Sequence, residues 1–588
     1  MQDATWLRVL RELGGRNRSI LQCGLLVTPL IIFAWLGWRN RWIVDDGYIF
    51  LRIVDQITRG NGPVFNAGER VEAFSSALWQ ALLVLADLAI PLRLEWLAVL
   101  LGIALSVGGL ALAMAGAAKI IRLYQPDALL LPFGILLPLS VFVAWRFASS
   151  GMETGLVLGW LGACLYVLAC WARDASRLTW PAAMLIGLGW LVRPELALFS
   201  ALFIATVLLL QWRQDSWRDR LLTLLAAGLI PVSYQIFRMG YYGSLVPNPA
   251  LTKDAADIYW AEGWLYLLDF ANTYWLWLAL LILLMGAYLP LVWGLWQQRA
   301  HRALAVAGVF VIAGLLQALY ITVIGGDWLH GRLLLPAFYA LALPVAIIPL
   351  ARTHALAVLI VPWALASAIS LRPPPPQITD MVVLPTHNHV LIETRGWGQQ
   401  SLRQQRLERA GGFHADVVLG MRFQPIESAT PGPYLRLPGI SARVLGLPPY
   451  ALGPDWHVID ALGLAHHITA RMEVTPSLSF FPRKAGHKKS LPVVWLAAMI
   501  TAEDSQPDPA EFPGAFNPLI PDTHGDEFQR QVEIVRMVLK CPALSELHAA
   551  VTEPLDWQRF VANFTGAWTR TRLTIPPHPD HAWQKFCA

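Results

Sequence analysis

The sequence has few charged residues for its length. Asp, Glu, Lys and Arg make up 14% of its 588 residues, whereas a soluble globular domain carries roughly 25%. A surface that faces water needs more charge than this, so the shortage excludes an ordinary soluble protein. Hydrophobic residues make up 56% of the chain and gather in long runs, which is typical of a protein that crosses a membrane several times.

Cysteine is also scarce, with five residues and no Cys-x-x-Cys or Cys/His spacing that would indicate zinc. Cys23, Cys164 and Cys170 lie inside apolar runs and are expected to pack as small hydrophobic side chains. Cys541 and Cys587 lie in a polar segment. Whether these two form a disulfide stays open, because separation in sequence does not give the distance between two Cα atoms.

The net charge is +5, but the sequence has no basic tract interleaved with aromatic residues. The absence of such a tract argues against a nucleic-acid partner. Internal repeats and coiled-coil heptads are also missing. The first apolar run, 20–38, is long and lacks the small-residue cleavage site of a signal peptide, so it is expected to be a membrane span.

Runs of apolar residues bounded by charges predict about eleven transmembrane helices, since a helix needs about 20 residues to cross the hydrocarbon. The predicted spans are 20–38, 96–118, 130–147, 152–171, 179–192, 195–212, 220–238, 272–297, 303–324, 333–350 and 355–371. The run 75–90 is short and interrupted by Asp87. It is interpreted as a re-entrant or juxtamembrane helix, although a further span stays open.

Lysine and arginine concentrate in alternate loops, which predicts orientation because cytoplasmic loops carry the excess of these residues. These loops hold Arg8, Arg11, Arg16, Arg18, Lys119, Arg122, Arg173, Arg177, Arg213, Arg218, Arg220, Arg299, Arg302 and Arg352. If they face the cytoplasm, an odd number of crossings places the C-terminus outside. The protein is therefore expected in the plasma membrane, with its C-terminal domain on the periplasmic side.

The composition changes after Leu371, where Arg372 precedes four prolines, Pro373–Pro376. Proline runs form stiff extended spacers. We therefore expect a membrane domain at 1–372 and a soluble domain at 373–588, which is polar and rich in proline and has no run long enough to span. The soluble domain is expected to be β-rich or mixed α/β.

Ionisable residues crowd the first predicted outer loop, 39–75. Asp45 and Asp46 are adjacent at a membrane boundary, followed by Tyr48. A carboxylate pair there is costly unless it binds something, and it suits general-base chemistry or a sugar hydroxyl. The alternative is that one aspartate only caps the next helix.

Four further polar clusters lie at span ends on the same predicted side. Taken alone, Ser150-Gly-Met-Glu153-Thr154 is better explained as an acidic helix start, and most of the loop around Asn248 as a proline-rich turn. Arg193-Pro-Glu195 is equally well explained as an internal ion pair. One glycine-rich loop contains Asp327, Trp328, His330 and Arg332. The planar fork of an arginine suits phosphate, and a tryptophan suits stacking on a sugar ring. The alternative is that Asp327 and Arg332 only pair with each other. Most of the 27 tryptophans are expected in the interfacial belt.

These clusters together resemble the GT-C class of membrane glycosyltransferases, and within it the arabinofuranosyltransferase B family. The matching stretches are Val44-Asp-Asp-Gly-Tyr-Ile49 with Gly60–Glu72, Ser150–Thr154, Arg193–Glu195, Tyr241–Asn248, Gly325–Arg332 and, more weakly, Ile459–Leu464 with Gly486–Lys488. Five of them fall in one order between residues 40 and 340. Gly47 stands where wider relatives have alanine, and Lys488 where many have glutamate, which weakens a role for His487.

The resemblance implies a polyprenyl-phosphate sugar donor, used on the outer side of the membrane. It implies transfer of terminal β(1→2)-linked arabinofuranose from decaprenyl-phosphoryl-arabinofuranose to the arabinan of arabinogalactan and lipoarabinomannan. Asp45 or Asp46 would be the catalytic carboxylate. No cofactor is expected, although a divalent metal is not excluded, and the protein is expected to act as a monomer.

From the chemistry of a lipid-linked donor we expect three sets of site residues. Arg332, His330 and Arg193 would neutralise the departing phosphate. Glu153, Glu72 and Arg70 would orient the site. The remaining residues, expected to bind substrate, are Glu195, Asp327, Glu69, Tyr48, Asn248 and Trp328. If donor and product are both β-linked, the configuration of the anomeric carbon is retained. A single in-line displacement would invert it. A base alone therefore does not account for the reaction.

Three other functions stay open at this stage. A transporter would show inverted repeats with broken helices in matching positions, and none is evident. A non-catalytic envelope assembly protein would not need Asp45 and Asp46. A transferase for another lipid-linked sugar would share every motif, since sugar choice depends on pocket shape. For the C-terminal domain, glycan binding rests on analogy alone.

Overall fold

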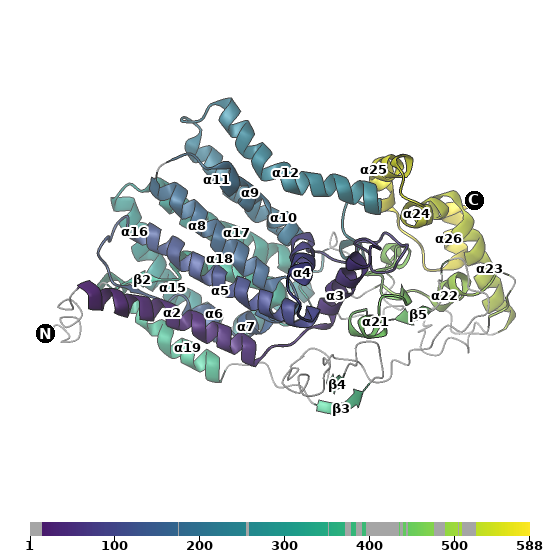
Figure 1. The fold of residues 1–588 in the computed structure, drawn as a ribbon, viewed down its shortest axis with the longest axis horizontal. Helices are drawn as coiled ribbons and strands as arrows, with labels where there is room; N and C mark the ends of the chain where they lie inside the picture. Colours follow the sequence, from purple (N-terminus) through teal and green to yellow (C-terminus); the bar gives the residue numbers. More distant parts are fainter. Residues whose placement is uncertain are drawn as a thin grey trace.

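Helices lying side by side form the larger part of this computed structural model (Figure 1). The structure describes residues 15–174, 176–253, 258–327, 329–350, 352–370, 378–383, 391–395, 434, 439–442, 445–474, 489–503, 505–507 and 525–588. We call residues 15–370 the membrane region and residues 434–588 the C-terminal region. The expected boundary at 372–373 lies outside the described residues.

The membrane region is almost entirely helical. Its elements are α2 (Gly15–Arg39), α3 (Asp45–Thr58), α4 (Ala77–Ala89), α5 (Leu94–Ile121), β1 (Leu130–Leu131), α6 (Leu136–Ser140), α7 (Phe142–Ala148), α8 (Thr154–Asp174), α9 (Trp180–Gly187), α10 (Gly189–Val192), η1 (Pro194–Leu196), α11 (Ala197–Gln211), α12 (Trp217–Tyr242), α13 (Asn248–Thr252), α14 (Trp260–Thr273), α15 (Leu276–Leu283), the π-helical η2 (Leu284–Tyr288), α16 (Leu289–Gln297), α17 (His301–Val323), η3 (Arg332–Leu334), α18 (Leu335–Ala342), η4 (Leu343–Val345), β2 (Ile348–Pro349), η5 (Arg352–Leu359) and α19 (Ile360–Ile369).

Small residues bring α5 and α8 together at the centre of this region. A Cβ atom added at Gly109 would lie 2.3 Å from the carbonyl oxygen of Leu158, and one added at Gly162 would lie 2.0 Å from that of Gly109. Such contacts are possible only because Gly109 and Gly162 have no Cβ atom, and close backbone approach at small residues is common in helix packing in membranes. This pair forms the frame on which the neighbouring helices pack.

Among the described residues, seven helices are long and apolar enough to cross a membrane. They correspond to the predicted spans at 20–38, 96–118, 152–171, 195–212, 220–238, 272–297 and 303–324. Three more predicted spans are shorter apolar helices, at Trp180–Val192, Arg332–Val345 and Leu356–Ile369. Helix α4 has 13 residues, which agrees with the interpretation of 75–90 as a juxtamembrane helix.

The predicted helix at 130–147 is wrong as a continuous element. Leu130 and Leu131 pair antiparallel with β2, and the backbone is extended at Val141 between α6 and α7. Ser367 donates its hydroxyl proton to the carbonyl of Ser140 at that break. The segment nevertheless traverses the bundle, because Gln22 near the start of α2 binds Leu130 and Trp42 beyond its end binds the carbonyl of Arg146.

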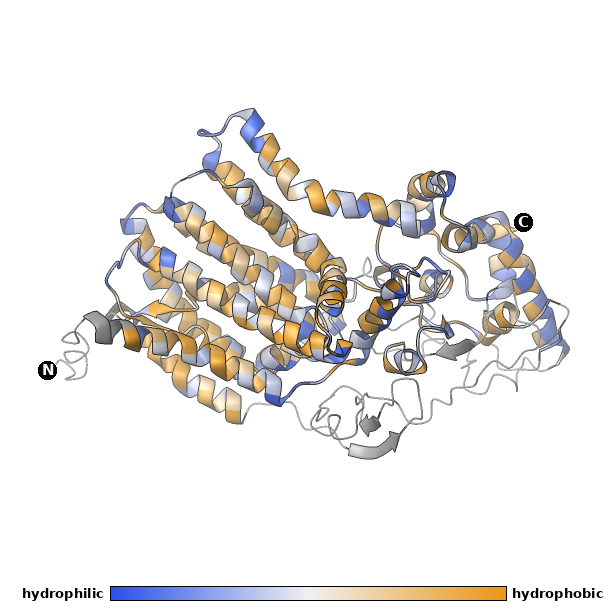
Figure 2. Ribbon diagram, viewed as in Figure 1, coloured by the Kyte–Doolittle hydropathy of each residue, from blue (hydrophilic) through white to orange (hydrophobic). Residues whose placement is uncertain are grey.

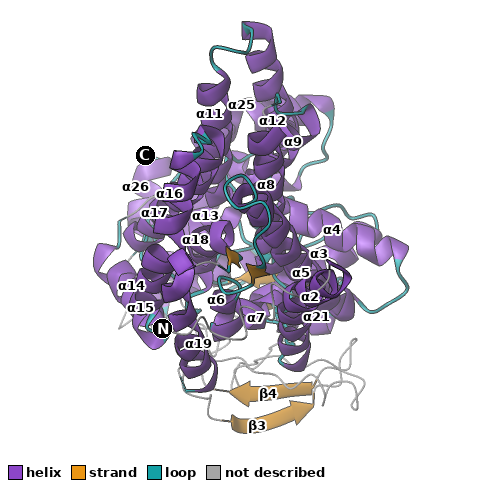
Figure 3. Cartoon of the chain, turned by 90° about the vertical axis from the view of Figure 1, so that its left-hand side faces the viewer, coloured by secondary structure: helices purple, strands orange, loops and turns teal. Residues whose placement is uncertain are grey.

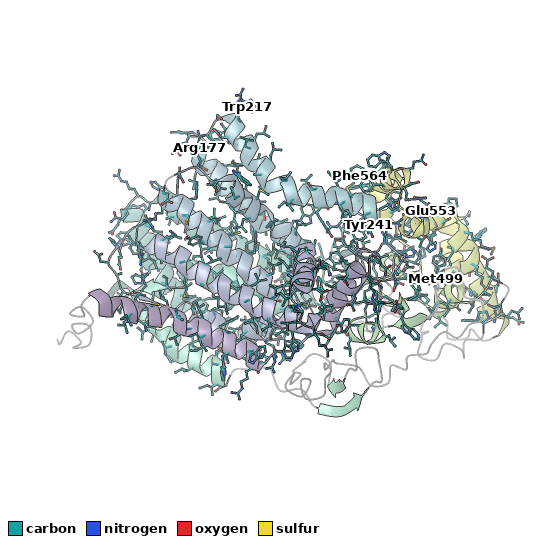
Figure 4. All side chains as sticks on the ribbon, in the orientation of Figure 1. Arg177, Trp217, Tyr241, Met499, Glu553 and Phe564 are labelled. Atoms are coloured by element: carbon teal, nitrogen blue, oxygen red, sulfur yellow. A yellow bond between two sulfur atoms is a disulfide. The ribbon has the colours of Figure 1, made fainter. Side chains whose placement is uncertain are left out.

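Figure 2 shows hydrophobic helices with hydrophilic residues at their ends. Arg177 forms ion pairs with Asp215 and Asp219 at 3.3 and 3.1 Å, and Arg302 donates to the carbonyl of Ser176. Three of the predicted cytoplasmic loops therefore meet at one end, where Figure 4 labels Arg177 and Trp217.

The C-terminal region lies at the opposite end of the bundle (Figure 1). Its elements are β5 (Gly439–Ala442), α21 (Leu447–Leu452), β6 (His457–Asp460), η6 (Thr469–Arg471), α22 (Val493–Ile500), α23 (Asp526–Lys540), α24 (Pro542–Thr552), α25 (Trp557–Arg572) and α26 (Pro579–Phe586). Strands β5 and β6 pair in parallel. Of the two architectures predicted for this region, the described residues show the mixed α/β one, with helices prevailing.

Two smaller features complete the description. Strands β3 (Ile378–Val383) and β4 (Leu391–Arg395) form an antiparallel pair that lies beside the bundle (Figure 3). Cys541 and Cys587 form a disulfide with their Cα atoms 5.6 Å apart, which answers the question that the sequence left open. The bridge joins the start of α24 to the residue after α26, so it closes the helical part of the C-terminal region.

Candidate active site

Asp46 lies in the first turn of α3, at the end of the bundle that faces the C-terminal region. The neighbouring Gly47 permits this position, because a Cβ atom there would lie 3.0 Å from the carbonyl oxygen of Ser150. That same carbonyl accepts a hydrogen bond from the backbone nitrogen of Val44. The glycine that distinguishes this sequence from wider relatives thus lets the Ser150–Thr154 motif lie directly against the aspartate motif.

Arg332 connects Asp46 to the Gly325–Arg332 motif. Its Nη1 atom is 3.8 Å from Oδ2 of Asp46, and its Nη2 atom is 2.5 Å from Oδ2 of Asp327. Nη1 also contacts the sulfur of Met152 at 3.0 Å. The Arg332 side chain is 5% exposed and that of Asp46 is 16% exposed, so Asp46 is the more accessible member of this pair.

Arg193 forms a second charged group beside the first. It donates to Glu195 at 2.5 Å and to Glu153, and the side chains of Arg193 and Glu153 are 13% and 1% exposed. The second carboxylate oxygen of Glu153 is buried and has no hydrogen-bond partner among the described residues. The sequence-based alternative of an Arg193–Glu195 ion pair is confirmed, and Glu153 extends that pair toward Met152.

The turn that carries Arg332 depends on Gly331. This residue has a φ of 64°, a left-handed conformation that favours glycine, and a Cβ atom there would lie 2.4 Å from the ring of Phe270. His330, one residue earlier, places Nδ1 2.5 Å from the carboxylate of Asp269. Its ring also packs against Phe270 and Tyr274, so its described partners are on α14 and beside it rather than the two arginines.

Six side chains from four separate motifs therefore meet at one place. Two guanidiniums, Arg193 and Arg332, face four carboxylates, which are Asp46, Glu153, Glu195 and Asp327. Both cations are held by carboxylates before any substrate binds, so they are fixed in place. Preorganised charge of this kind stabilises a developing charge without the cost of reorganisation. Within the described residues no group of three or more ligand side chains suits a metal ion.

Asp45 has a different environment from Asp46. Its two carboxylate oxygens accept hydrogen bonds from the backbone nitrogens of Gly446 and Leu447, at 3.1 and 2.9 Å. These residues begin α21 in the C-terminal region. Of the two aspartates that the sequence offered as the catalytic carboxylate, Asp45 ties the two regions together and Asp46 faces the arginines.

Two further acidic residues of the first outer loop, Glu69 and Glu72, lie near this contact between regions. Glu72 is buried and accepts hydrogen bonds from Arg238 at 2.6 Å and from Tyr234 at 2.7 Å. Glu69 accepts from Asn66 and lies 3.3 Å from His457. Both carboxylates are thus satisfied by partners away from Asp46.

Arg70, Asn248 and Tyr48 make contacts of the same kind. Arg70 donates to the carbonyls of Tyr241 and Ala550. Asn248 donates to the carbonyls of Gly463, Leu464 and His466. The Tyr48 ring is fully buried against Tyr450, with ring centroids 5.3 Å apart. These residues hold the C-terminal region on the membrane region.

Histidines of the C-terminal region line the same contact. Burial lowers the pKa of His466 to about 4 and lowers the pKa of His467 well below its usual range. Burial opposes ionisation of Glu69, but attraction to His457 outweighs it and holds the pKa of Glu69 below its usual range. Glu69 is therefore a buried anion beside imidazoles, of which His466 and His467 stay neutral.

A small cleft opens between the two regions. Arg70, Glu72 and Asn248 line it from the membrane region, and Arg471 and Arg570 line it from the C-terminal region. Arg471 is buried and donates to the carbonyls of Arg570 and His467. Trp328 and the segment Gly486–Lys488 lie outside the described residues.

The sequence did not single out several residues that shape the site. Asp269 carries no motif and stands in a helix of mixed polarity. Arg52 is fully buried in α3 and donates to the carbonyls of Pro449, Gly453 and Trp456. A lone arginine on an apolar helix was the available signal for it, because such a residue needs buried partners.

Comparisons with known proteins identify the family of the chain. Residues 437–585 match the model of the AftB family C-terminal domain. A terminal β-(1→2)-arabinofuranosyltransferase of Mycobacterium tuberculosis is 32% identical over 94% of this chain and 95% of its own length. A Corynebacterium glutamicum protein of the same name is 31% identical over 97% of this chain and 89% of its own. No solved structure matches significantly. The chain belongs to the terminal β-(1→2)-arabinofuranosyltransferase family of membrane proteins.

Proposed function

We propose that this protein is a membrane glycosyltransferase that adds terminal β(1→2)-linked arabinofuranose to arabinan chains. Its donor is decaprenyl-phosphoryl-arabinofuranose, and its acceptors are the arabinans of arabinogalactan and lipoarabinomannan. The relatives' shared name supports the reaction, since their similarity extends over nearly the whole chain. Donor and acceptor follow from the chemistry of the site and from the family resemblance.

One observation carries the proposal: Asp46, Glu153, Arg193, Asp327 and Arg332 meet at one end of an apolar helix bundle. A lipid-linked sugar needs this arrangement. Its prenyl tail stays in the hydrocarbon beside the helices, so its phosphate can reach only groups at a helix end. Ionisable groups at membrane depth are expensive and mark such substrate sites.

The transfer forms a bond between the acceptor's 2-hydroxyl oxygen and the anomeric carbon, and breaks the bond between that carbon and the phosphate oxygen. In our proposal Asp46 orients the acceptor hydroxyl and takes its proton, and the polyprenyl phosphate leaves with the bonding electrons. Arg332 and Arg193 face the departing phosphate. If net configuration is retained, the phosphate departs before the acceptor attacks, or a covalent intermediate forms first.

No metal takes part in this proposal, because the two arginines supply the positive charge. Transfer in the presence of excess EDTA tests the point directly. Equal rates with and without the chelator are expected, and a loss restored by one added divalent ion would contradict it.

We place the site and the C-terminal region on the periplasmic face of the plasma membrane. At the other end of the bundle, Arg177 and Arg302 bind residues of neighbouring loops. This supports the orientation, because basic loops stay in the cytoplasm. The C-terminal region would bind the arabinan acceptor, and the protein would act as a monomer.

Transfer of radiolabel from polyprenyl-phosphoryl-arabinose to a short arabinan acceptor, in membranes that carry the protein, tests the proposal. Labelled arabinan with a terminal β(1→2) linkage is the expected product. Activity with a different lipid-linked pentose or hexose, and none with the arabinose donor, would contradict the sugar assignment.

A further inference from the structure

Helix α25 presents three different faces along its length. One face is buried against the protein, and includes Asn563, Ala567 and Arg570. A polar face, with Gln558, Thr565 and Thr569, is exposed. The third face is apolar and also accessible.

The apolar face is formed by Trp557, Val561, Phe564 and Trp568. These residues recur at intervals of four, three and four positions, so they form one stripe on a helix of 3.6 residues per turn. Trp557 is 75% exposed, Val561 41% and Trp568 60%. Arg572 lies over the ring of Trp568 at 5.1 Å. The stripe contains no acidic residue.

The buried side of α25 fixes the helix to the end of transmembrane α12. The Phe560 ring packs on Gly240, where a Cβ atom would lie 2.2 Å from ring carbons. Asn563 donates to the carbonyl of Gly240 at 3.1 Å, and Arg570 to that of Gly243 at 3.2 Å. Figure 4 labels Tyr241 and Phe564 in the neighbourhood of this junction.

The position of the stripe relative to α12 decides what covers it. On α12, Val232 and Ile236 are 57% and 46% exposed, so the outer part of α12 faces lipid. Phe560 lies on the apolar side of α25, next to the stripe, and touches α12. The stripe therefore continues the lipid-facing surface of α12, whereas the polar face points away from it.

We propose that α25 is an interfacial membrane helix, whose stripe of Trp557, Val561, Phe564 and Trp568 inserts into the outer leaflet. Amphipathic helices of this kind bury their apolar face about 5–10 Å into the boundary between headgroups and acyl chains. Tryptophan favours this depth. The C-terminal region is thereby held at the membrane surface by lipid as well as by its contacts with α3 and α12.

Site-directed fluorescence in nanodiscs of phosphatidylethanolamine and phosphatidylglycerol tests this proposal. Cys23, Cys164 and Cys170 are replaced by alanine in the full chain, and the disulfide is kept. The probe NBD is then attached in separate proteins at Phe564→Cys and Val561→Cys, with Thr569→Cys on the polar face of the same helix as the matched control.

Probes at positions 564 and 561 should emit at shorter wavelength than the probe at 569. A nitroxide on the lipid acyl chain should quench them several-fold more, and aqueous iodide several-fold less. Equal iodide quenching at all three positions would overturn the proposal. Shielding that appears only when arabinan is added, or only when the protein is concentrated, would also overturn it, in favour of a glycan or a second copy. The two stripe positions guard against a local folding defect at either one.

Discussion

Oδ2 of Asp46 lies 3.8 Å from Nη1 of Arg332, although the two residues belong to motifs at opposite ends of the membrane region's sequence. Asp45, the next residue along the chain, instead accepts hydrogen bonds from Gly446 and Leu447. Adjacent carboxylates that look equivalent in the sequence thus have separate tasks. One belongs to the charged site, and the other joins the site to the C-terminal region.

Replacing Asp45 by Asn should weaken the contact between regions more than it weakens transfer. The amide keeps one acceptor oxygen but turns an NH₂ group toward a backbone N–H, which costs about 1–3 kcal/mol. Hydrogen exchange in residues 446–452 should rise, while transfer should fall less than tenfold. Asp55→Asn on the same helix serves as the control. Complete loss of transfer with an unchanged exchange rate would return Asp45 to the catalytic role.

Replacing Arg193 by Lys should reduce both stability and transfer. A lysine amine cannot reproduce the planar fork that reaches Glu153 and Glu195 together, and a buried carboxylate left without its partner costs about 3–5 kcal/mol. Arg177→Lys, which changes an arginine that is itself 60% exposed at the opposite end, is the matched control. Thermal unfolding and kcat measure the two effects. A variant as stable and active as the parent would show that Arg193 does not organise this site.

The sequence predicted the charged cluster well for a physical reason. Ionisable groups such as Glu153, Arg193 and Arg332 are expensive at membrane depth, so each one indicates a buried partner or a substrate. Glu72 and Asn248 belong to equally strong motifs, but their partners are backbone and side-chain groups that hydropathy does not reveal. The motifs therefore indicated which residues have specific partners. They did not indicate which of these residues belong to the site and which to the contact between the two regions.

Hydropathy predicted where the apolar helices lie better than it predicted their form. The run 130–147 is apolar enough for a helix, yet Leu130 pairs with β2 and the chain is extended at Val141. Both features depend on residues near 348 and 367, far away in sequence. Composition along a single segment cannot carry such information.

Acidification should destabilise the C-terminal region through its buried histidines. Burial lowers the pKa of His466 from 6.5 to about 4, so the unfolded chain takes up a proton first as the pH falls. The stability is fully present above pH 6.5 and is lost as the pH falls to about 4, with a slope near 1.4 kcal/mol per pH unit at most.

The midpoint of thermal unfolding, measured from pH 8 to pH 4, shows this dependence. His466→Gln should flatten the slope below pH 6.5, and His301→Gln, an exposed histidine at the other end of the bundle, should not. An unchanged slope in His466→Gln would mean that another group controls the acid response.

Removing the disulfide should loosen the helices that it closes. Cys541 and Cys587 are separated by 46 residues, and a bridge over a loop of this size contributes about 2–4 kcal/mol, chiefly by restricting the unfolded chain. Replacing Cys541 and Cys587 by serine should therefore raise the rate of amide hydrogen exchange in α23 to α26. Cys23→Ser, an exposed free cysteine, is the control. Identical exchange with and without the bridge would leave it without a stabilising role.

The rate of arabinose transfer by the Asp46→Asn variant is the most direct test of the site. Asparagine keeps the shape of the side chain but cannot accept the acceptor's proton or carry charge toward Arg332. Radiolabelled polyprenyl-phosphoryl-arabinose is supplied with a short arabinan to the parent, Asp46→Asn and Asp45→Asn. We expect a loss of at least about a hundredfold, typical of removing a catalytic acid or base, in Asp46→Asn alone and with unchanged thermal stability. Transfer by Asp46→Asn at the parent's rate would contradict the account.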